Sequence, residues 1–209
     1  MRIYNLGEPA NEPLLLSEVR DHLRIDHSEE DAYLGALITA SRIYAESWTG
    51  LHLVDQTLKV TLDQWPVGRR GHWWSGLTDG PLTSLFGTVD NFRLPVAPVS
   101  KINEIRTLGT DGSFTQWDSG LYRLVGGVDP ALELASGASW PPPAGKTGGI
   151  EISVTAGFGP DWNSVPAAIR QAMLMIVARL YAARGDSPAE AMRTTGAATL
   201  LAPFRRVKL

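Results

Sequence analysis

The sequence predicts an α+β fold in which helices from both ends of the chain form a bundle around a β-rich insertion. Apolar residues recur at helical spacing before Gly50 and again after Pro166, whereas short alternating segments separated by Gly and Pro fill the middle. At 209 residues the chain can bury one substantial core. We therefore predict a single domain, residues 1–209, with N-terminal helices in 1–50, the insertion in 51–160, C-terminal helices in 161–193 and an extended tail in 194–209.

The N-terminal part is predicted to hold two helices. Ser17 can cap a short helix over residues 18–24, and Ser28, followed by Glu29, Glu30 and Asp31, can open a longer one. Gly50 suits the position just after a helix end. The longer helix has one apolar face, made by Leu34, Leu37, Ile38, Ala45 and Trp48.

The middle part is predicted to be a set of short strands. The turn at residues 109–112, Gly-Thr-Asp-Gly, is typical of a hairpin. Residues 65–91 are rich in Gly and Pro and show no regular pattern, so we expect a long loop there. The expected strands cover residues 53–62, 92–95, 102–108, 114–117, 122–125, 131–135 and 150–155.

A long C-terminal helix is predicted from Pro166 onward, because proline suits the first turn of a helix. Its apolar stripe consists of Ile169, Met173, Ile176, Val177 and Leu180. Leu174 and Met175 lie off this stripe, so the helix is apolar on more than one side, which suits a helix covered by both its own domain and a neighbour. The tail from Thr194 has no clear periodicity and combines Leu200, Leu201 and Phe204 with Arg205, Arg206 and Lys208.

Composition and charge narrow the function classes. The chain has 0 cysteines, which excludes disulfides and thiolate metal sites, and no apolar run reaches the roughly 20 residues of a membrane span. The net charge of −3 argues against a general nucleic-acid binder. Residues 1–60 have a charge of −5 and residues 161–209 of +4. This asymmetry is either chance or a basis for head-to-tail contact.

The sequence does not predict a catalytic or metal site. Residues 144–147 resemble a phosphate-binding loop, but Trp140 stands where that motif requires glycine, and a strand follows instead of a helix. His22, Asp26 and His27 are better explained as a polar helix junction than as metal ligands. No nucleophile is paired with a base. We therefore expect no enzyme activity, no metal and no cofactor.

Two surface features have alternative interpretations. Trp73 and Trp74, with Arg69 and Arg70, are either a loop packed on its own domain or an aromatic anchor at an interface. An aromatic platform that binds a glycan or peptide is the alternative function. The basic end, with Phe204 and Leu209 as apolar anchors, is either solvated or a clip that enters a groove of a partner.

Several stretches together resemble head–tail connector (adaptor) proteins of tailed bacteriophages and gene transfer agents. In the first half they are LSEVRDHLRID at 16–26, the acidic residues 29–31 and the helix ending at 48–50. In the second half they are ISVTAGFG at 152–159 and VPAAIRQA at 165–172, and between them lie PVAPV at 95–99 and Asp111-Gly112. The match covers most of the chain in order and spacing.

The resemblance implies a structural role in the virion or a phage-like particle, at the head–tail interface. Such adaptors form a ring, usually twelve-fold, beneath the portal protein, contact a stopper or other tail component, and let DNA pass without specific binding. They assemble in the bacterial cytoplasm and involve no membrane. Family members commonly dock their C-terminal segment on the portal, which assigns this role to Leu200, Leu201, Phe204, Arg205, Arg206, Lys208 and Leu209. The long 65–91 loop departs from the family pattern.

Overall fold

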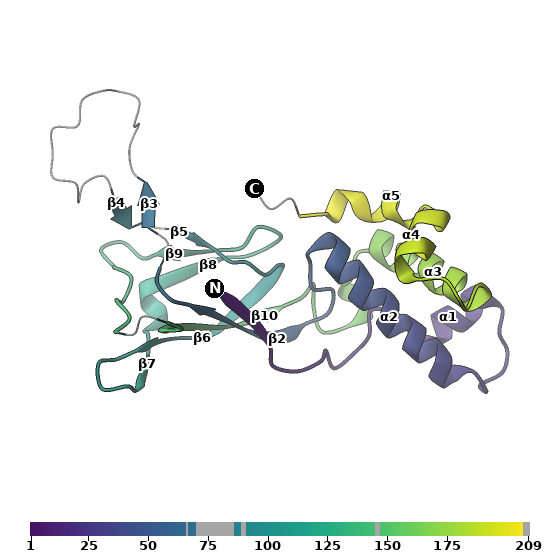
Figure 1. The fold of residues 1–209 in the computed structure, drawn as a ribbon, viewed down its shortest axis with the longest axis horizontal. Coiled ribbons are helices and arrows are strands. Elements are labelled where there is room, and N and C mark those ends of the chain that lie inside the picture. The colour runs from purple at the N-terminus through teal and green to yellow at the C-terminus, as the bar shows by residue number, and fades with distance from the viewer. Residues whose placement is uncertain (66, 70–85, 89–90, 145–146, 207–209) are drawn as a thin grey trace, which may run out of the picture. The chain divides into compact units, whose positions relative to one another are not determined.

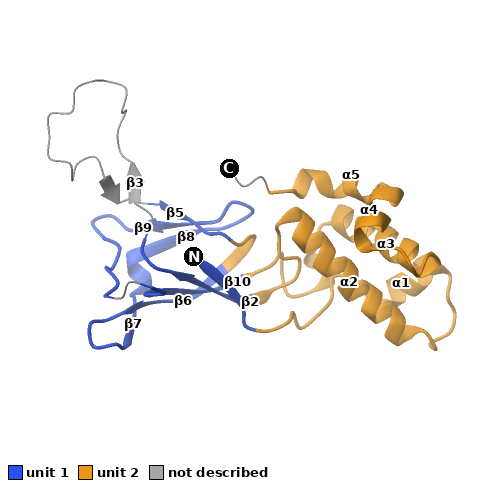
Figure 2. Cartoon of the chain, viewed as in Figure 1, with its two compact units in different colours: residues 1–6, 57–95, 101–155 blue, residues 7–56, 96–100, 156–209 orange. Residues whose placement is uncertain are grey.

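The computed structural model describes residues 1–65, 67–69, 86–88, 91–144 and 147–206, with only the backbone described at 67–69 and 86–88. The chain forms two compact units (Figure 2). Unit 1 comprises residues 1–6, 57–95 and 101–155, and unit 2 comprises residues 7–56, 96–100 and 156–209. Mixed helix and sheet confirm the α+β class.

Unit 1 contains the sheets, drawn in Figure 1. A five-stranded sheet has the order β1-β2-β10-β6-β7, a three-stranded sheet has the order β5-β9-β8, and β3 pairs with β4. The bounds are β1 Arg2–Asn5, β2 Gln56–Leu62, β3 Val67–Arg69, β4 Phe86–Thr88, β5 Asn91–Arg93, β6 Val99–Leu108, β7 Phe114–Gln116, β8 Tyr122–Val125, β9 Ala131–Leu134 and β10 Ile150–Ala156, with a short 3-10 turn, η2, at Ser119–Leu121.

Strand alternation explains the core of unit 1. Every second residue of β2 and of β10 is buried, so one face of the larger sheet is apolar and the other is polar. Four aromatic side chains complete this core: Trp65, Phe92, Trp117 and Trp140. The Trp65 ring stacks on Trp140 at 4.3 Å between centroids, and its Nε1–H donates to the Pro141 carbonyl at 2.9 Å. The N–H group of this buried indole is thus hydrogen-bonded.

Unit 2 is helical, with α3 in contact with each of the other helices (Figure 1). The bounds are α1 Leu16–Leu23, α2 Asp31–Thr49, α3 Ala167–Ala182, α4 Pro188–Thr195 and α5 Ala197–Leu201, with 3-10 turns η3 Trp162–Ser164 and η4 Ala202–Phe204. Gly50 ends α2 in the left-handed conformation, φ 73°, as predicted. No helix among the described residues is long and apolar enough to span a membrane.

Several sequence-based expectations need correction. The N-caps of α1 and α2 are Leu15 and Glu30 rather than Ser17 and Ser28, and neither cap side chain accepts a helix N–H. The strand β1 was not predicted. Within the expected long loop, β3 and β4 form an antiparallel pair and Trp65 belongs to the core, so the loop is shorter than 65–91.

The predicted extended tail is wrong for its described part. Residues 197–204 form α5 and η4, after Gly196 turns the chain at φ 76°. Ala197 and Leu201 are fully buried at helical spacing against the core of unit 2. The segment folds because that core offers an apolar partner. A helix of so few residues leaves too short a periodic pattern to be recognised in the sequence.

Candidate functional site

The predicted docking segment is mostly folded onto α2 and the helical core. Leu201 is buried, and Leu200 and Phe204 are partly buried against the core. The Arg205 guanidinium lies 5.1 Å from the centre of the Trp48 ring, a cation–π distance. Lys208 and Leu209 lie outside the described residues. The docking role of the segment stays a prediction, and Leu201 now has a structural role as well.

The backbone of Arg206 caps the C-terminal end of α2. The last carbonyls of a helix lack an intrahelical donor. The Arg206 N–H donates to the Thr49 carbonyl at 2.8 Å and so satisfies one of them. The Thr49 hydroxyl donates to Ala45 O at 2.7 Å and accepts from the Leu51 N–H at 3.3 Å. The C-terminal segment is therefore anchored at a defined point just before its final residues.

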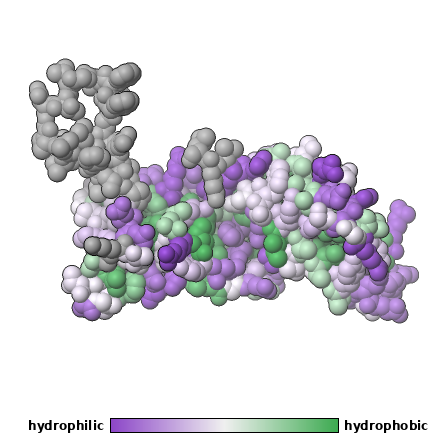
Figure 3. All heavy atoms as spheres, viewed as in Figure 1, coloured by the Kyte–Doolittle hydropathy of each residue, from purple (hydrophilic) through white to green (hydrophobic). Residues whose placement is uncertain are grey.

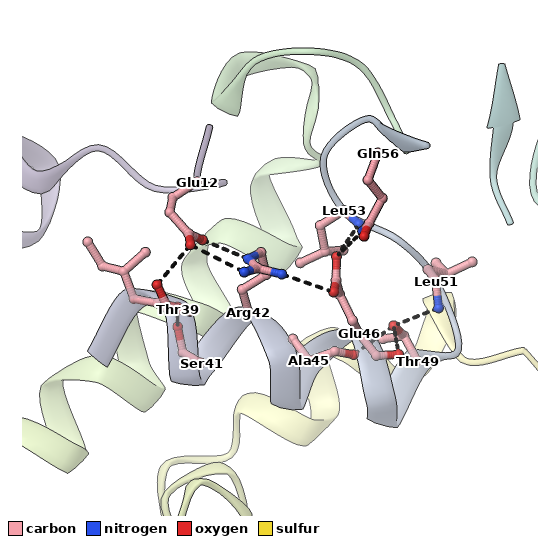
Figure 4. Close-up of polar contacts among 11 residues, drawn as sticks. Glu12, Thr39, Ser41, Arg42, Ala45, Glu46, Thr49, Leu51, Leu53 and Gln56 are labelled. Atoms are coloured by element: carbon pink, nitrogen blue, oxygen red, sulfur yellow. Dashed lines mark hydrogen bonds and ion pairs between the residues drawn. The ribbon is translucent and has the colours of Figure 1, made fainter. Parts of the chain in front are cut away.

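A buried ionic network lies along the same helix (Figure 4). Arg42 has a side chain only 6% exposed, yet it sits on the apolar face of α2 between Ile38 and Ala45. Its Nε–H donates to Glu12 Oε2 at 2.8 Å, and its Nη1 lies 3.4 Å from Glu46 Oε2. The sequence analysis missed this network, although Arg42 on an apolar stripe was a signal for it, and spacing alone does not give the partners of Arg42.

Glu46 extends the network to the segment before β2. The Leu53 N–H donates to Glu46 Oε1 at 2.9 Å, and Gln56 Nε2 donates to the same oxygen at 3.4 Å. Burial raises the pKa of Glu46, while the Leu53 N–H and Arg42 oppose that shift. Glu12, α2 and residues 53–56 are thus held together by two carboxylates and one guanidinium. Glu12, Arg42 and Glu46 therefore form a structural clamp.

His52 is a half-buried histidine near this clamp. Burial, together with Arg206 and Arg42, lowers the pKa of His52 to about 4, so the ring is neutral at neutral pH. Its backbone N–H donates to Ala97 O at 2.8 Å, while its Nδ1 is buried without a hydrogen-bond partner. Across the described residues no group of three or more His, Asp or Glu side chains could hold a metal. His22, Asp26 and His27 do not form such a group.

Leu174 and Met175 face the core of their own unit. Leu174 is 6% exposed and Met175 is partly buried in the same cluster. Because α1, α2, α4 and α5 all contact α3, a helix that is apolar on several sides is required within the unit. A role for these two residues between subunits stays a prediction.

Part of the sequence charge asymmetry is neutralised inside unit 2. Arg170 pairs with Glu18 and Arg184 with Glu30, both at 3.1 Å, so basic residues of the C-terminal part face acidic residues of the N-terminal part. Asp21, Asp26 and Glu29 are exposed near the turn between α1 and α2. Figure 3 shows hydrophilic residues gathered at that end of the unit. These acids are available for contact with a basic partner.

Unit 1 has a hollow of about 480 Å³ on its larger sheet. Arg2, Tyr4, Lys59, Thr61 and Glu151 contribute to its lining. Lys59 and Arg106 both pair with Glu151, at 3.1 and 2.9 Å. Because Lys59 and Glu151 already pair with each other, this lining favours a surface of mixed charge over a binding site for one ion. Of the predicted loop interface, Arg70, Trp73 and Trp74 lie outside the described residues, and only the backbone of Arg69 is described.

Comparison with known proteins gives matches of two kinds. Residues 14–68 match the family described as phage gp6-like head-tail connector protein. Solved chains match over 100% of this chain and 97% of theirs: one from the neck of an empty GTA particle computed with C6 symmetry, 28% identical with a TM-score of 0.75, and one from the virion of a native gene transfer agent (GTA) particle, 26% identical with a TM-score of 0.72.

A third chain, from the neck of a native GTA particle computed with C12 symmetry, is 25% identical over the same coverage, with a TM-score of 0.67. A search of curated proteins found no significant match. The family match and the full-length structural matches confirm the resemblance predicted from the sequence.

Proposed function

We infer that the chain is a head–tail connector protein, a structural adaptor that joins head to tail in a phage or phage-like particle. The observation that carries this function is the full-length match, TM-score 0.75, to a chain in the neck of a gene transfer agent particle. The connector-family match over residues 14–68 supports it independently, since it covers α1, α2 and β2.

The adaptor works as a homo-oligomeric ring within the particle. Matching neck structures were solved with C6 and C12 symmetry, which supports cyclic assembly. We propose twelve subunits, located at the head–tail interface and assembled in the bacterial cytoplasm. A closed ring requires that each subunit present two unlike surfaces that fit each other.

The proposed partners are the portal protein on one side and a stopper or other tail component on the other. The geometry of the C-terminal segment supports portal docking by its final residues. Phe204 packs on the core, and Arg205 and Arg206 contact Trp48 and Thr49 of α2, so the segment is anchored up to Arg206. A rigid anchor lowers the entropy cost of binding a partner.

The proposed role is non-catalytic, with DNA passing through the ring without specific binding. The matched family and the matched neck chains are structural components of particles, which supports this assignment. A net charge of −3 also suits a conduit, because DNA binders neutralise phosphates with an excess of cations.

Ring formation and portal binding test the proposal. The purified chain is examined by mass photometry and electron microscopy, then by co-sedimentation with the portal protein encoded beside it. We expect cyclic rings that co-sediment with the portal. A chain that stays monomeric and does not bind the portal protein at any concentration or salt condition would contradict the adaptor function.

A charge-reversal pair tests the docking segment specifically. Arg205→Glu with Lys208→Glu is expected to weaken co-sedimentation with the portal about tenfold or more. The control, Arg93→Glu with Arg193→Glu, makes the same charge change at side chains that are 76% and 77% exposed elsewhere. Equal portal binding by the two variants would reject docking through this segment.

A further inference from the structure

The five-stranded sheet of unit 1 ends in two exposed edge strands. The order β1-β2-β10-β6-β7 places β1 at one end and β7 at the other. All four residues of β1 and all three of β7 are exposed. An open edge strand offers backbone N–H and C=O groups to a strand of another chain. Head-to-tail addition of one copy of the chain to the next requires two different open edges, and this sheet has both.

At the β1 edge, the backbone groups of Ile3 are among those that point away from the sheet. The Leu6 N–H donates to Thr57 O at 3.1 Å, and the register pairs Tyr4 with Lys59 and Arg2 with Thr61. In an antiparallel ladder, hydrogen-bonded pairs alternate, so the Ile3 N–H and C=O point away from β2. Ile3 itself is 45% exposed, and its neighbours Tyr4 and Leu6 are 43% and 56% exposed. The described residues of the chain therefore cover these apolar side chains only in part.

At the β7 edge, the outward groups belong to Phe114 and Gln116. The Trp117 N–H donates to Ile105 O and the Gly109 N–H to Ser113 O, both at 2.8 Å. With Thr115 opposite Thr107 in this register, the groups of Phe114 and Gln116 point away from β6. Phe114 is 41% exposed, so this edge also combines free backbone groups with an apolar side chain.

The charges that have no ion-pair partner among the described residues differ in sign at the two edges. Arg106, whose guanidinium lies 5.8 Å from the centre of the Phe114 ring, is already paired with Glu104 and Glu151. Arg2 on β1 is exposed and forms no ion pair with any described residue. Exposed Asp111 and Asp118 lie on either side of β7 in the chain. Within the described part of the chain their side chains accept hydrogen bonds from their own turns, Asp111 from Ser113 and Asp118 from Gly120. Contact of β1 with β7 brings unlike charges together, whereas contact of β7 with β7 brings together like charges. The charges therefore favour a heterologous contact between copies.

We propose that the β1 edge of one copy binds the β7 edge of the next, so that the sheet continues from subunit to subunit around the ring. This inference rests on the proposed ring and adds the surface by which copies join. Ile3 then lies beside Phe114 and Gln116 of the neighbour and exchanges backbone hydrogen bonds with them. The partner of both edges is a second copy of this chain, since both edges are short and exposed and their unpaired charges are opposite in sign.

Cross-linking tests the contact, and the absence of native cysteine makes the chain well suited to it. Rings of the Ile3→Cys, Thr115→Cys variant are first verified by electron microscopy and then treated with a short bismaleimide. We expect a ladder of covalent oligomers up to the ring size. Ile3→Cys alone and Ile3→Cys with Val128→Cys are the controls. Val128 is 50% exposed and outside both edges, so these controls should give no ladder.

The outcomes separate the inference from the proposed function. Verified rings without a ladder, or a ladder from Ile3→Cys alone, would overturn the β1–β7 contact and leave the adaptor function intact. Failure to form rings under any condition would overturn both.

A backbone variant gives a second, independent measurement. Ile3→Pro removes an N–H that points away from β2, so the thermal melt of the monomer should be unchanged. The protein concentration needed for ring formation should rise about tenfold, as expected for one lost interface hydrogen bond. An unchanged concentration would contradict the proposed pairing.

Discussion

Replacement of Arg42 by methionine should destabilise unit 2 far more than the same change at a partly exposed arginine. Arg42 is 6% exposed and Glu46 14%, so removal of the guanidinium leaves a buried carboxylate without its cation. Loss of one partner of a buried ion pair costs about 3 kcal/mol. For a chain of this size the melting temperature should fall by roughly 6–12 °C. Urea unfolding followed by circular dichroism measures the free energy.

The loss of stability in Arg42→Met should depend on pH because of Glu46. Its pKa is already raised by burial, and removal of Arg42 raises it further. A carboxyl with a raised pKa in the folded state favours folding more as the pH falls, because the folded state then binds more protons. The loss in Arg42→Met should therefore shrink between pH 7 and pH 5. Arg42→Met with Glu46→Gln should recover stability at pH 7, since the amide oxygen can still accept the Leu53 N–H.

The matched control is Arg20→Met. Arg20 pairs with Asp31 through two hydrogen bonds on the same kind of helical surface, but these side chains are 28% and 32% exposed. Such a pair contributes about 1 kcal/mol or less. If Arg42→Met costs no more than Arg20→Met, or if the Glu46→Gln change recovers nothing, the clamp does not have the role inferred for it.

Four further substitutions have defined outcomes. His52→Gln should alter the pH dependence of the free energy of unfolding. Because the pKa of His52 is about 4 against an ordinary 6.5, its contribution to stability is present above pH 6.5 and is lost as the pH falls toward 4. The stability difference between wild type and variant should change by up to roughly 3 kcal/mol across that window in urea titrations, and a constant difference would contradict this. Gly157→Ala should destabilise the protein by about 3 kcal/mol or more, since a Cβ there would lie 2.4 Å from the Asp55 backbone nitrogen. Gly35→Ala in α2, with open space around it, should stabilise the protein by about 0.5–1 kcal/mol. Equal melting temperatures of the two variants would refute this contrast. Trp65→Ala should cost about 3–5 kcal/mol, because it empties the centre of the aromatic core of unit 1, and a near-native thermal melt would argue against that central position.

Local patterns were sufficient for most of the secondary structure. The helices α2 and α3 and the hairpin of β6 and β7 follow from periodicity and turn chemistry, because each shows one buried face or one tight turn within a short stretch. The end of α2 at Gly50 follows from a backbone conformation that glycine adopts without strain. The family resemblance likewise came from residue order alone, and the structural matches confirm it.

The candidate site was less accessible to sequence reasoning. The basic end was identified, but its first residues were expected to be extended, whereas Leu201 is buried and Arg206 caps α2. The off-stripe residues of α3 pack within their own unit, and their contact with a neighbour stays a prediction. The fold of the C-terminal segment was missed because burial depends on segments that are far apart in the chain.

The sequence by itself determined the α+β class, the positions of the long helices and most strands, and the connector resemblance, since these depend on neighbouring residues. Only the tertiary structure decided that Arg42 joins Glu12 to Glu46, that the chain end folds as a cap on α2, and that β1 and β7 are the open edges of one sheet. These features require contacts across more than a turn or a strand, and the free energy of such contacts is set by burial and partner geometry, which no local pattern encodes.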